Sequence, residues 1–126
     1  MKKIETPSAP LPVGPYSQAI AHGELVFCSG QIPLDPKTGK LIEGEIEAQV
    51  ERVMDNLRAV LEAAGSGMDR VLRTTIYVTD LSLFARVNRV YGKYFPETPP
   101  ARATVQVAAL PLGALVEIDA VAIAGR

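Results

Sequence analysis

The chain has 126 residues, of which 48% are hydrophobic and 21% charged, and its formal net charge is −1; this composition suits one globular domain with its own core. A charge so close to zero argues against recruitment to nucleic acid or to an anionic membrane by a bulk electrostatic field. The chain has one cysteine, Cys28, and one histidine, His22, which excludes an intrachain disulfide and argues against a zinc site built from these residue types.

The N-terminal part is predicted to be extended. Residues 1–7 contain no apolar signal segment and no apolar run approaches ~18 residues, so we expect a cytoplasmic protein without a membrane span. Four prolines between residues 6 and 15 exclude a helix there, and Gly14-Pro15 presents Tyr16 from a rigid backbone. Residues 17–21 and 25–29 are predicted to be the strands of a hairpin that turns at residues 22–23, with Cys28 an inert buried thiol.

A helix is predicted from about Glu45 to Ala64, where apolar residues recur at spacings of three and four. The residues of this stripe are Ile46, Val50, Val53, Leu57, Val60 and Ala64. Gly65 follows as a natural helix terminator. Ahead of this helix, residues 35–40 are typical of a turn, and residues 41–42 are predicted to form a short edge strand.

The next two elements are a β-branched strand over residues 71–78 and a helix from about residue 83 to residue 94. Asn88 borders the apolar stripe of this helix and therefore needs a polar partner. The sequence leaves two alternatives for Asn88: a hydrogen bond to a loop carbonyl, or a place in a functional site.

A strand then begins at Arg102, behind the two prolines Pro99 and Pro100. Arg102 is placed to bind a planar anion such as a carboxylate, although an arginine that merely extends into water is the commoner case. The last strand, residues 115–124, is mostly apolar on both faces but carries Glu117 and Asp119 on one of them, so it is expected to be buried on both sides.

This order of elements predicts one α+β domain over residues 1–126, with two helices packed on one face of a mixed sheet. The uncovered face is expected to combine apolar side chains with charged and polar ones. The latter are Arg73, Thr75, Tyr77, Arg102, Thr104, Gln106, Glu117 and Asp119. Such a face favours subunit assembly, with arginine and glutamate meeting in clefts between subunits. There Arg102 could bind a small carboxylate while Glu117 orients or deprotonates a water; a buried ion pair between Glu117 and a strand arginine is the structural alternative.

Several segments, taken together and in order, resemble the RidA (YjgF-type) family. They are residues 14–19 (GPYSQA), 29–33 (SGQIP), 55–57 (DNL), 61–65 (LEAAG), 100–105 (PARATV) and 116–122 (VEIDAVA). The resemblance implies a chorismate-mutase-like subunit and a homotrimer whose sheets form a central barrel, with sites between subunits. It also implies hydrolysis of 2-aminoacrylate/2-iminopropanoate and 2-iminobutanoate to 2-oxo acids and ammonia, with no cofactor and no metal.

By position, the resemblance gives Arg102 the role of binding the substrate carboxylate and Glu117 that of positioning water. Tyr16, Ser29, Gly30, Asn88 and Thr104 would line or support the site. Thr104 departs from the family pattern, since many members carry cysteine there, and this leaves the substrate preference open. Two other functions remain: an endoribonuclease or translation inhibitor, which the charge disfavours, and a non-catalytic module that binds small metabolites or acts as a chaperone.

Overall fold

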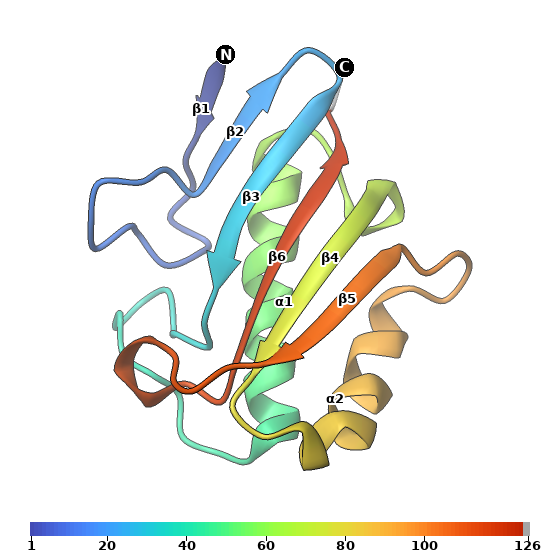
Figure 1. Ribbon diagram of the computed structural model, residues 1–126. Coiled ribbons are helices and arrows are strands. Elements are labelled where there is room, and N and C mark those ends of the chain that lie inside the picture. The colour runs from blue at the N-terminus through green and yellow to red at the C-terminus, as the bar shows by residue number, and fades with distance from the viewer. Residues whose placement is uncertain (125–126) are drawn as a thin grey trace.

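The computed structural model describes residues 1–124, which contain a six-stranded mixed sheet and two α-helices (Figure 1). The strand order is β1-β2-β3-β6-β4-β5, and all pairings are antiparallel except the parallel pair β4–β5. The strands are β1 (Lys2–Ile4), β2 (Ala19–His22), β3 (Leu25–Gln31), β4 (Val71–Val78), β5 (Ala101–Gln106) and β6 (Val116–Ile123). The α-helices are α1 (Ile46–Ala63) and α2 (Phe84–Tyr91). Short 3-10 turns occupy Met68–Arg70, Leu81–Leu83, Gly92–Tyr94 and Pro111–Gly113.

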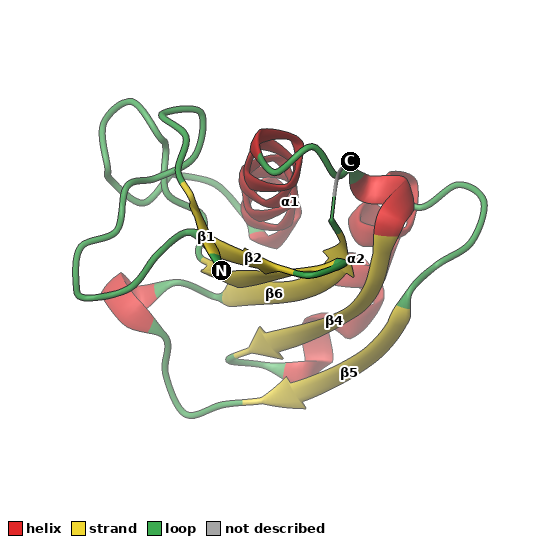
Figure 2. Cartoon of the chain, turned by 90° about the horizontal axis from the view of Figure 1, so that it is seen from above, coloured by secondary structure: helices red, strands yellow, loops and turns green. Residues whose placement is uncertain are grey.

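Both helices lie behind the sheet in Figure 1, and Figure 2 shows α1 on one side of the sheet, seen from above. This arrangement confirms the predicted α+β class with two helices on one face. The predicted stripe of α1 is buried, with Val50, Val53 and Leu57 at most 1% exposed. They pack against the buried face of β6, which includes Val116 and Ile118. The apolar spacing of three and four residues therefore identified the helix and its buried side.

Three details of the predicted elements need correction. Lys2–Ile4 forms an edge strand that was not predicted, because three residues carry too little pattern to be recognised. Residues 41–42 form no strand; Leu41 makes one isolated bridge to Leu34. The helix predicted over residues 83–94 is divided into α2 and a 3-10 turn over Gly92–Tyr94. The single domain predicted over residues 1–126 stays a prediction, and its last two residues lie outside the described range.

The face assigned to three residues of β5 was wrong. Arg102, Thr104 and Gln106 were expected on the uncovered face of the sheet. In the parallel register they stand opposite Thr74, Ile76 and Val78 of β4, which are buried on the helix side. Glu117 and Asp119 do lie on the other face, opposite Tyr77 and Thr75. β5 does alternate between small apolar and polar residues, but it is an edge strand in which no residue is buried, so alternation alone does not show which side faces the helices.

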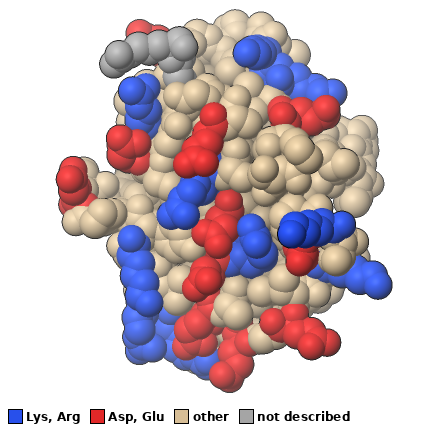
Figure 3. Space-filling view, turned by 180° about the vertical axis from the view of Figure 1, so that it is seen from behind, with Lys and Arg blue, Asp and Glu red and all other residues tan. Residues whose placement is uncertain are grey.

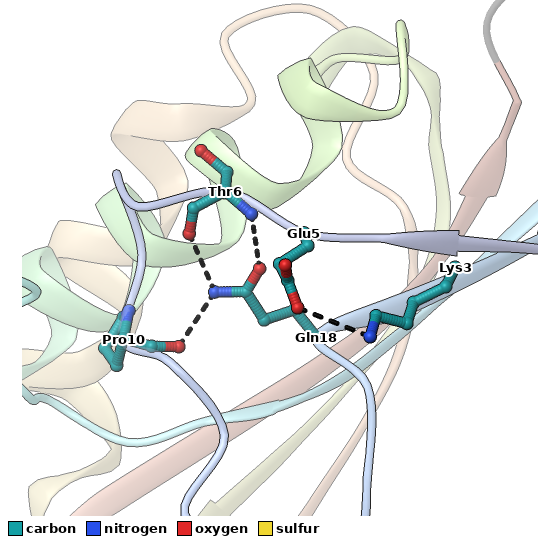
Figure 4. A network of polar contacts seen from close by, with 5 residues as sticks. All are labelled: Lys3, Glu5, Thr6, Pro10 and Gln18. Carbon is teal, nitrogen blue, oxygen red and sulfur yellow. Dashed lines mark hydrogen bonds and ion pairs between the residues drawn. The ribbon is translucent and has the colours of Figure 1, made fainter.

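A buried glutamine fixes the proline-rich segment, residues 6–15, against the sheet (Figure 4). Gln18 is 1% exposed. Its Nε2 donates to the carbonyls of Thr6, Ala9 and Pro10 at 3.0, 3.2 and 2.8 Å, and its Oε1 accepts from the Thr6 amide at 2.7 Å. Because prolines leave this segment few backbone donors of its own, one side chain supplies the hydrogen bonds that hold its path.

Replacing Gln18 by alanine is expected to lower the free energy of unfolding by about 1–2 kcal/mol, because buried backbone groups of residues 6–10 lose their partner. Urea denaturation at fixed protein concentration measures the change. Glu5→Ala is the matched control, since it removes only an exposed ion pair to Lys3 at 3.5 Å, and such pairs contribute little. Equal midpoints for Gln18→Ala and the unsubstituted protein would contradict the structural role of Gln18.

Candidate functional site

The first part of the candidate site is a cavity of about 590 Å³ on the Glu117 side of the sheet. Four of the residues predicted for the site line this cavity together: Tyr16, Ser29, Gly30 and Glu117. They come from the segment before β2, from β3 and from β6, which are adjacent in the sheet or connected directly to it. The structure therefore brings these predicted residues to one place.

Glu117 projects from β6 and is half-buried. Burial, and secondarily the charge of Asp119, raises the pKa of the Glu117 carboxyl above its ordinary value. Tyr77 donates a hydrogen bond from its hydroxyl to Oδ2 of Asp119 at 3.1 Å. A carboxyl group with a raised pKa, open to a cavity, can exchange protons with a bound molecule closer to neutral pH than an ordinary glutamate.

Gly30 lies directly against this carboxyl group. A Cβ atom at position 30 would stand 2.8 Å from Cδ of Glu117, which is closer than real contacts allow, and 3.0 Å from its Cγ, which is a tight contact. The pairing of β3 with β6 is irregular between Cys28 and Gln31, so the backbone at Gly30 departs from the regular ladder. Glycine at this position leaves room for the Glu117 side chain, which passes over the strand.

Gly30→Ala is expected to displace the Glu117 carboxyl group and to reduce any activity that depends on it by about tenfold or more. The fold should survive, because the obstacle is a side chain that can move. Gly92→Ala is the matched control: apart from its chain neighbours and the backbone of its own turn, no atom of residues 1–124 lies within 4 Å of a Cβ built at Gly92. Turnover and circular dichroism of both variants measure the effect, and full activity in Gly30→Ala would contradict it.

Ser29 and Tyr16 shape the cavity in different ways. The Ser29 hydroxyl donates to the carbonyl of Ser17 at 2.6 Å, and the Ser29 amide donates to the carbonyl of Gln18 at 2.9 Å. Ser29 thus fixes the backbone that follows Tyr16. Tyr16 itself is 50% exposed, and its ring remains available to a ligand.

The second part of the site surrounds Arg102 on the helix side of the sheet. Nη1 of Arg102 donates to Oδ1 of Asn88 at 2.8 Å. The guanidinium carbon lies 5.3 Å from the ring centroid of Phe84 and 5.0 Å from that of Tyr91. These three α2 residues are spaced four and three apart, so one helix face holds the guanidinium by a hydrogen bond and two cation–π contacts. Asn88 thereby has the polar partner that its position required.

Thr104 lies beside Arg102 in a surface hollow of about 520 Å³ that Leu81 and Phe84 also line. Its hydroxyl oxygen is buried and has no hydrogen-bond partner among the described residues. Arg102 retains nitrogen donors that Asn88 does not occupy. The hollow therefore presents a fixed cation and an unsatisfied hydroxyl, which together suit a small anion with hydrogen-bonding oxygens.

An ion pair anchors the helix that carries this cation-binding face. Nε and Nη2 of Arg86 on α2 donate to the two carboxylate oxygens of Glu47 on α1, both at 2.7 Å. The hydrogen bonds from Arg86 lower the pKa of Glu47 to about 2. This bidentate contact joins α2 to the longer helix and so fixes the position of Asn88 and Phe84.

One chain does not bring the two parts together. Arg102, Asn88 and Thr104 lie on the helix side, whereas Glu117, Tyr16, Ser29 and Gly30 lie around the other cavity; the two cavities have no lining residue in common. The ring contacts of Phe84 and Tyr91 with Arg102 were not predicted, although their spacing around Asn88 could have indicated them. The role of Gln18 was not predicted either, and the shortage of backbone donors in residues 6–15 was the available signal.

The described residues were also examined for metal-ligand clusters and for membrane-spanning helices. Among residues 1–124, no three histidine, cysteine, aspartate or glutamate side chains gather closely enough to hold a metal ion. Within the same residues, neither α-helix has the length and apolar character needed to cross a membrane.

Comparison with known proteins gives consistent matches. The family described as "Endoribonuclease L-PSP" matches residues 6–124. "Protein DfrA" of Myxococcus xanthus is 57% identical over 124 residues, covering 97% of this chain and 95% of that protein. "Reactive Intermediate Deaminase A, chloroplastic" of Arabidopsis thaliana is 48% identical over 119 residues, covering 94% of this chain and 64% of that protein. The crystal structure of E. coli TdcF with bound serine superposes with a TM-score of 0.94 at 40% identity and covers 98% of both chains.

Proposed function

The chain belongs to the endoribonuclease L-PSP (YjgF/RidA) family, and from this premise we propose that it hydrolyses reactive imines. Its substrates would be 2-iminopropanoate, 2-iminobutanoate and their enamine tautomers, such as 2-aminoacrylate, and its products 2-oxo acids and ammonia. The observation that carries the proposal is the pair of complementary parts: a guanidinium held ready for a carboxylate, and a carboxyl group with a raised pKa in a cavity.

The reaction needs only water and proton transfer. Arg102 would bind the substrate carboxylate, with Asn88 holding the guanidinium and Thr104 adding a hydroxyl contact. Glu117 would take a proton from water as the oxygen bonds to C2 of the imine, and would pass that proton to the imine nitrogen to give a carbinolamine. The Glu117 carboxylate would then move the proton of the new hydroxyl group to the amino nitrogen as the C–N bond breaks, so that the nitrogen leaves as ammonia and the oxygen becomes the carbonyl of the 2-oxo acid. Tyr16, Ser29 and Gly30 would shape the cavity around this step.

Because the two parts lie on opposite faces of one sheet, we propose that the site is completed between subunits of a homotrimer, Arg102 from one subunit meeting Glu117 of the next. The uncovered sheet face supports assembly, since Phe27, Val105 and Ile123 are 48%, 41% and 42% exposed there. Exposed apolar side chains on one face of a sheet favour contact with another copy.

This arrangement predicts complementation between two inactive variants. Refolding Arg102→Ala and Glu117→Gln together in equal amounts should restore activity, because roughly one quarter of randomly formed interfaces would contain both intact residues. Each variant refolded alone is the control. If mixed oligomers are shown to form and activity does not recover, the proposal of a site between subunits is wrong.

The direct test of the function uses 2-aminoacrylate generated in situ from serine by a dehydratase. We expect the purified protein to accelerate release of ammonia and pyruvate above the spontaneous rate, with no added cofactor. A rate equal to the spontaneous one, for imines from serine and from threonine alike, would reject the proposal.

The family's description makes ribonuclease the competing function. Acidic side chains lie among the basic ones over the face seen from behind in Figure 3, and this mixture of the described charges does not favour a phosphate backbone. RNA cleavage that survives repeated purification and disappears in Arg102→Ala would favour this alternative. Saturable binding of a 2-oxo acid without turnover would instead favour a non-catalytic binding module.

A further inference from the structure

The Tyr91 ring that contacts Arg102 is held at its hydroxyl by a buried hydrogen bond. The hydroxyl oxygen lies 2.7 Å from Oγ1 of Thr74 on β4, and either atom can be the donor. Tyr91 and Thr74 are 4% and 1% exposed, so water does not replace this bond. The next buried residues on this face of β4, Ile76 and Val78, are apolar. Valine at position 74 and phenylalanine at position 91 would satisfy packing alone, so packing does not explain the two hydroxyl groups.

The register of the sheet places Thr74 directly opposite Arg102 in the parallel pairing of β4 with β5. Paired residues of neighbouring strands extend from the same face of a sheet, so both side chains leave it on the side where α2 lies. Tyr91 of α2 reaches both of them: its hydroxyl bonds to Thr74, and its ring centroid lies 5.0 Å from the guanidinium carbon of Arg102. Two strands and one helix therefore meet at a single aromatic ring.

The two rings that contact the guanidinium differ in how firmly they are held. Tyr91 is bonded at its hydroxyl and packs against the buried Phe95, with ring centroids 4.9 Å apart and ring planes at 50°. Phe84, in contrast, is 36% exposed. A cation interacts more strongly with a ring that is shielded from water than with an exposed one. Tyr91 is therefore the ring that can fix the orientation of Arg102.

A fixed orientation matters because Arg102 is exposed and its side chain is long. Ordering such a side chain only when a ligand arrives weakens binding. The hydrogen bond from Nη1 to Oδ1 of Asn88, at 2.8 Å, restrains one nitrogen of the guanidinium, and a fixed ring restrains the rest of the group. The remaining N–H donors then keep one direction before a carboxylate binds.

We propose that Thr74 and Tyr91 are positioning residues for the substrate carboxylate: their hydrogen bond fixes the Tyr91 ring, and the ring holds the Arg102 guanidinium in one orientation. The inference rests on the proposed function, in which Arg102 binds the carboxylate. It adds two residues that act through Arg102 and do not themselves need to touch the substrate.

The test is a double-mutant cycle of Tyr91→Phe, Thr74→Val and the variant with both substitutions, each of which preserves the shape of the side chain. Calorimetry with pyruvate, which carries the carboxylate of the product, measures binding at Arg102. Each single substitution should weaken pyruvate binding about fivefold, and both together no more than one alone, because they remove the same bond. In imine hydrolysis the change should appear as a higher KM with kcat nearly unchanged, since Glu117 is intact.

Stability separates positioning from a merely structural role. Each single substitution leaves one buried hydroxyl group without its partner and should lower the urea midpoint, whereas the double substitution removes both groups and should regain most of the loss. Pyruvate binding should nevertheless stay weak in the double variant. Tyr94→Phe is the matched control: it removes a tyrosine hydroxyl that donates to Oδ1 of Asp55 on α1 at 2.9 Å, and it should leave pyruvate binding unchanged.

Pyruvate binding by the double variant decides this inference, and turnover decides the proposed function. Weaker binding than in Tyr94→Phe supports the positioning role, whatever the two urea midpoints. Binding equal to that of Tyr94→Phe overturns the role and leaves imine hydrolysis intact. If no imine is hydrolysed, the proposed function fails and the same titration still decides between these outcomes. An unsubstituted protein that binds no pyruvate also overturns the positioning role.

Discussion

Arg102→Ala is expected to lower kcat/KM for imine hydrolysis by at least thirtyfold, equivalent to about 2 kcal/mol or more. Among the described residues that line the Arg102 hollow, the guanidinium is the one group that combines positive charge with free donors, and it is already held by Asn88, Phe84 and Tyr91. Its loss leaves the substrate carboxylate without a charge partner. Steady-state kinetics with the in-situ imine measures the change, and the expected loss lies in both substrate binding and turnover.

Two variants make this result specific. Arg102→Lys keeps the charge but loses the planar fork, so it should recover only part of the activity. Arg89→Ala removes an exposed arginine of α2 that does not line the Arg102 hollow, and it should retain full activity. Undiminished activity in Arg102→Ala would mean that the carboxylate binds elsewhere, and equal losses in Arg102→Ala and Arg89→Ala would indicate a general charge effect.

Glu117→Gln is expected to lower kcat by about 10²–10⁴-fold, the contribution typical of a positioned proton acceptor. The substitution keeps the shape of the side chain over Gly30 and removes only its ability to accept a proton. Folding should not suffer. Because burial raises the pKa of Glu117 in the folded protein, its ionisation opposes folding as pH rises above the unfolded value. Glu117→Gln should therefore unfold at an equal or higher urea concentration at neutral pH.

The neighbouring carboxylate provides the control for Glu117. Asp119 contributes to the raised pKa of Glu117, so Asp119→Asn should lower that pKa while leaving the proton acceptor in place. If catalysis needs the Glu117 carboxylate, the acidic limb of the pH profile of kcat/KM should move to lower pH in Asp119→Asn. An unmoved limb, or near-normal turnover in Glu117→Gln, would show that another group accepts the proton.

Strong periodicity made much of the fold predictable. The stripe from Ile46 to Val60 identified α1 and its buried face, and the alternation from Val116 to Ala122 identified the β6 residues that lie against it. Asn88 was predicted to need a partner, and the structure supplies Arg102. Four residues that line the cavity, Tyr16, Ser29, Gly30 and Glu117, were also named from the sequence, because they lie in the motifs that resemble the family.

Long-range contacts decided the rest. Gln18 holds residues 6–10 through bonds to backbone atoms up to 12 residues away, and no local pattern encodes that arrangement. The strand at Lys2–Ile4 forms only because it pairs with β2, whereas residues 41–42 find no such neighbour. A short segment with weak intrinsic β-propensity forms a strand only where the rest of the sheet provides an edge strand to pair with.

The sequence by itself determined that Arg102 lies near the start of a strand, which begins one residue earlier at Ala101, and that Glu117 lies within another, since prolines and alternation act locally. Only the tertiary structure decided that the two residues lie on opposite sides of the sheet. The decisive element is the parallel pairing of β5 with β4, which sets Arg102 beside buried Thr74. Period-two alternation divides a strand into two faces, but when neither is strongly apolar only the register and the helix packed above it determine which face is turned inward.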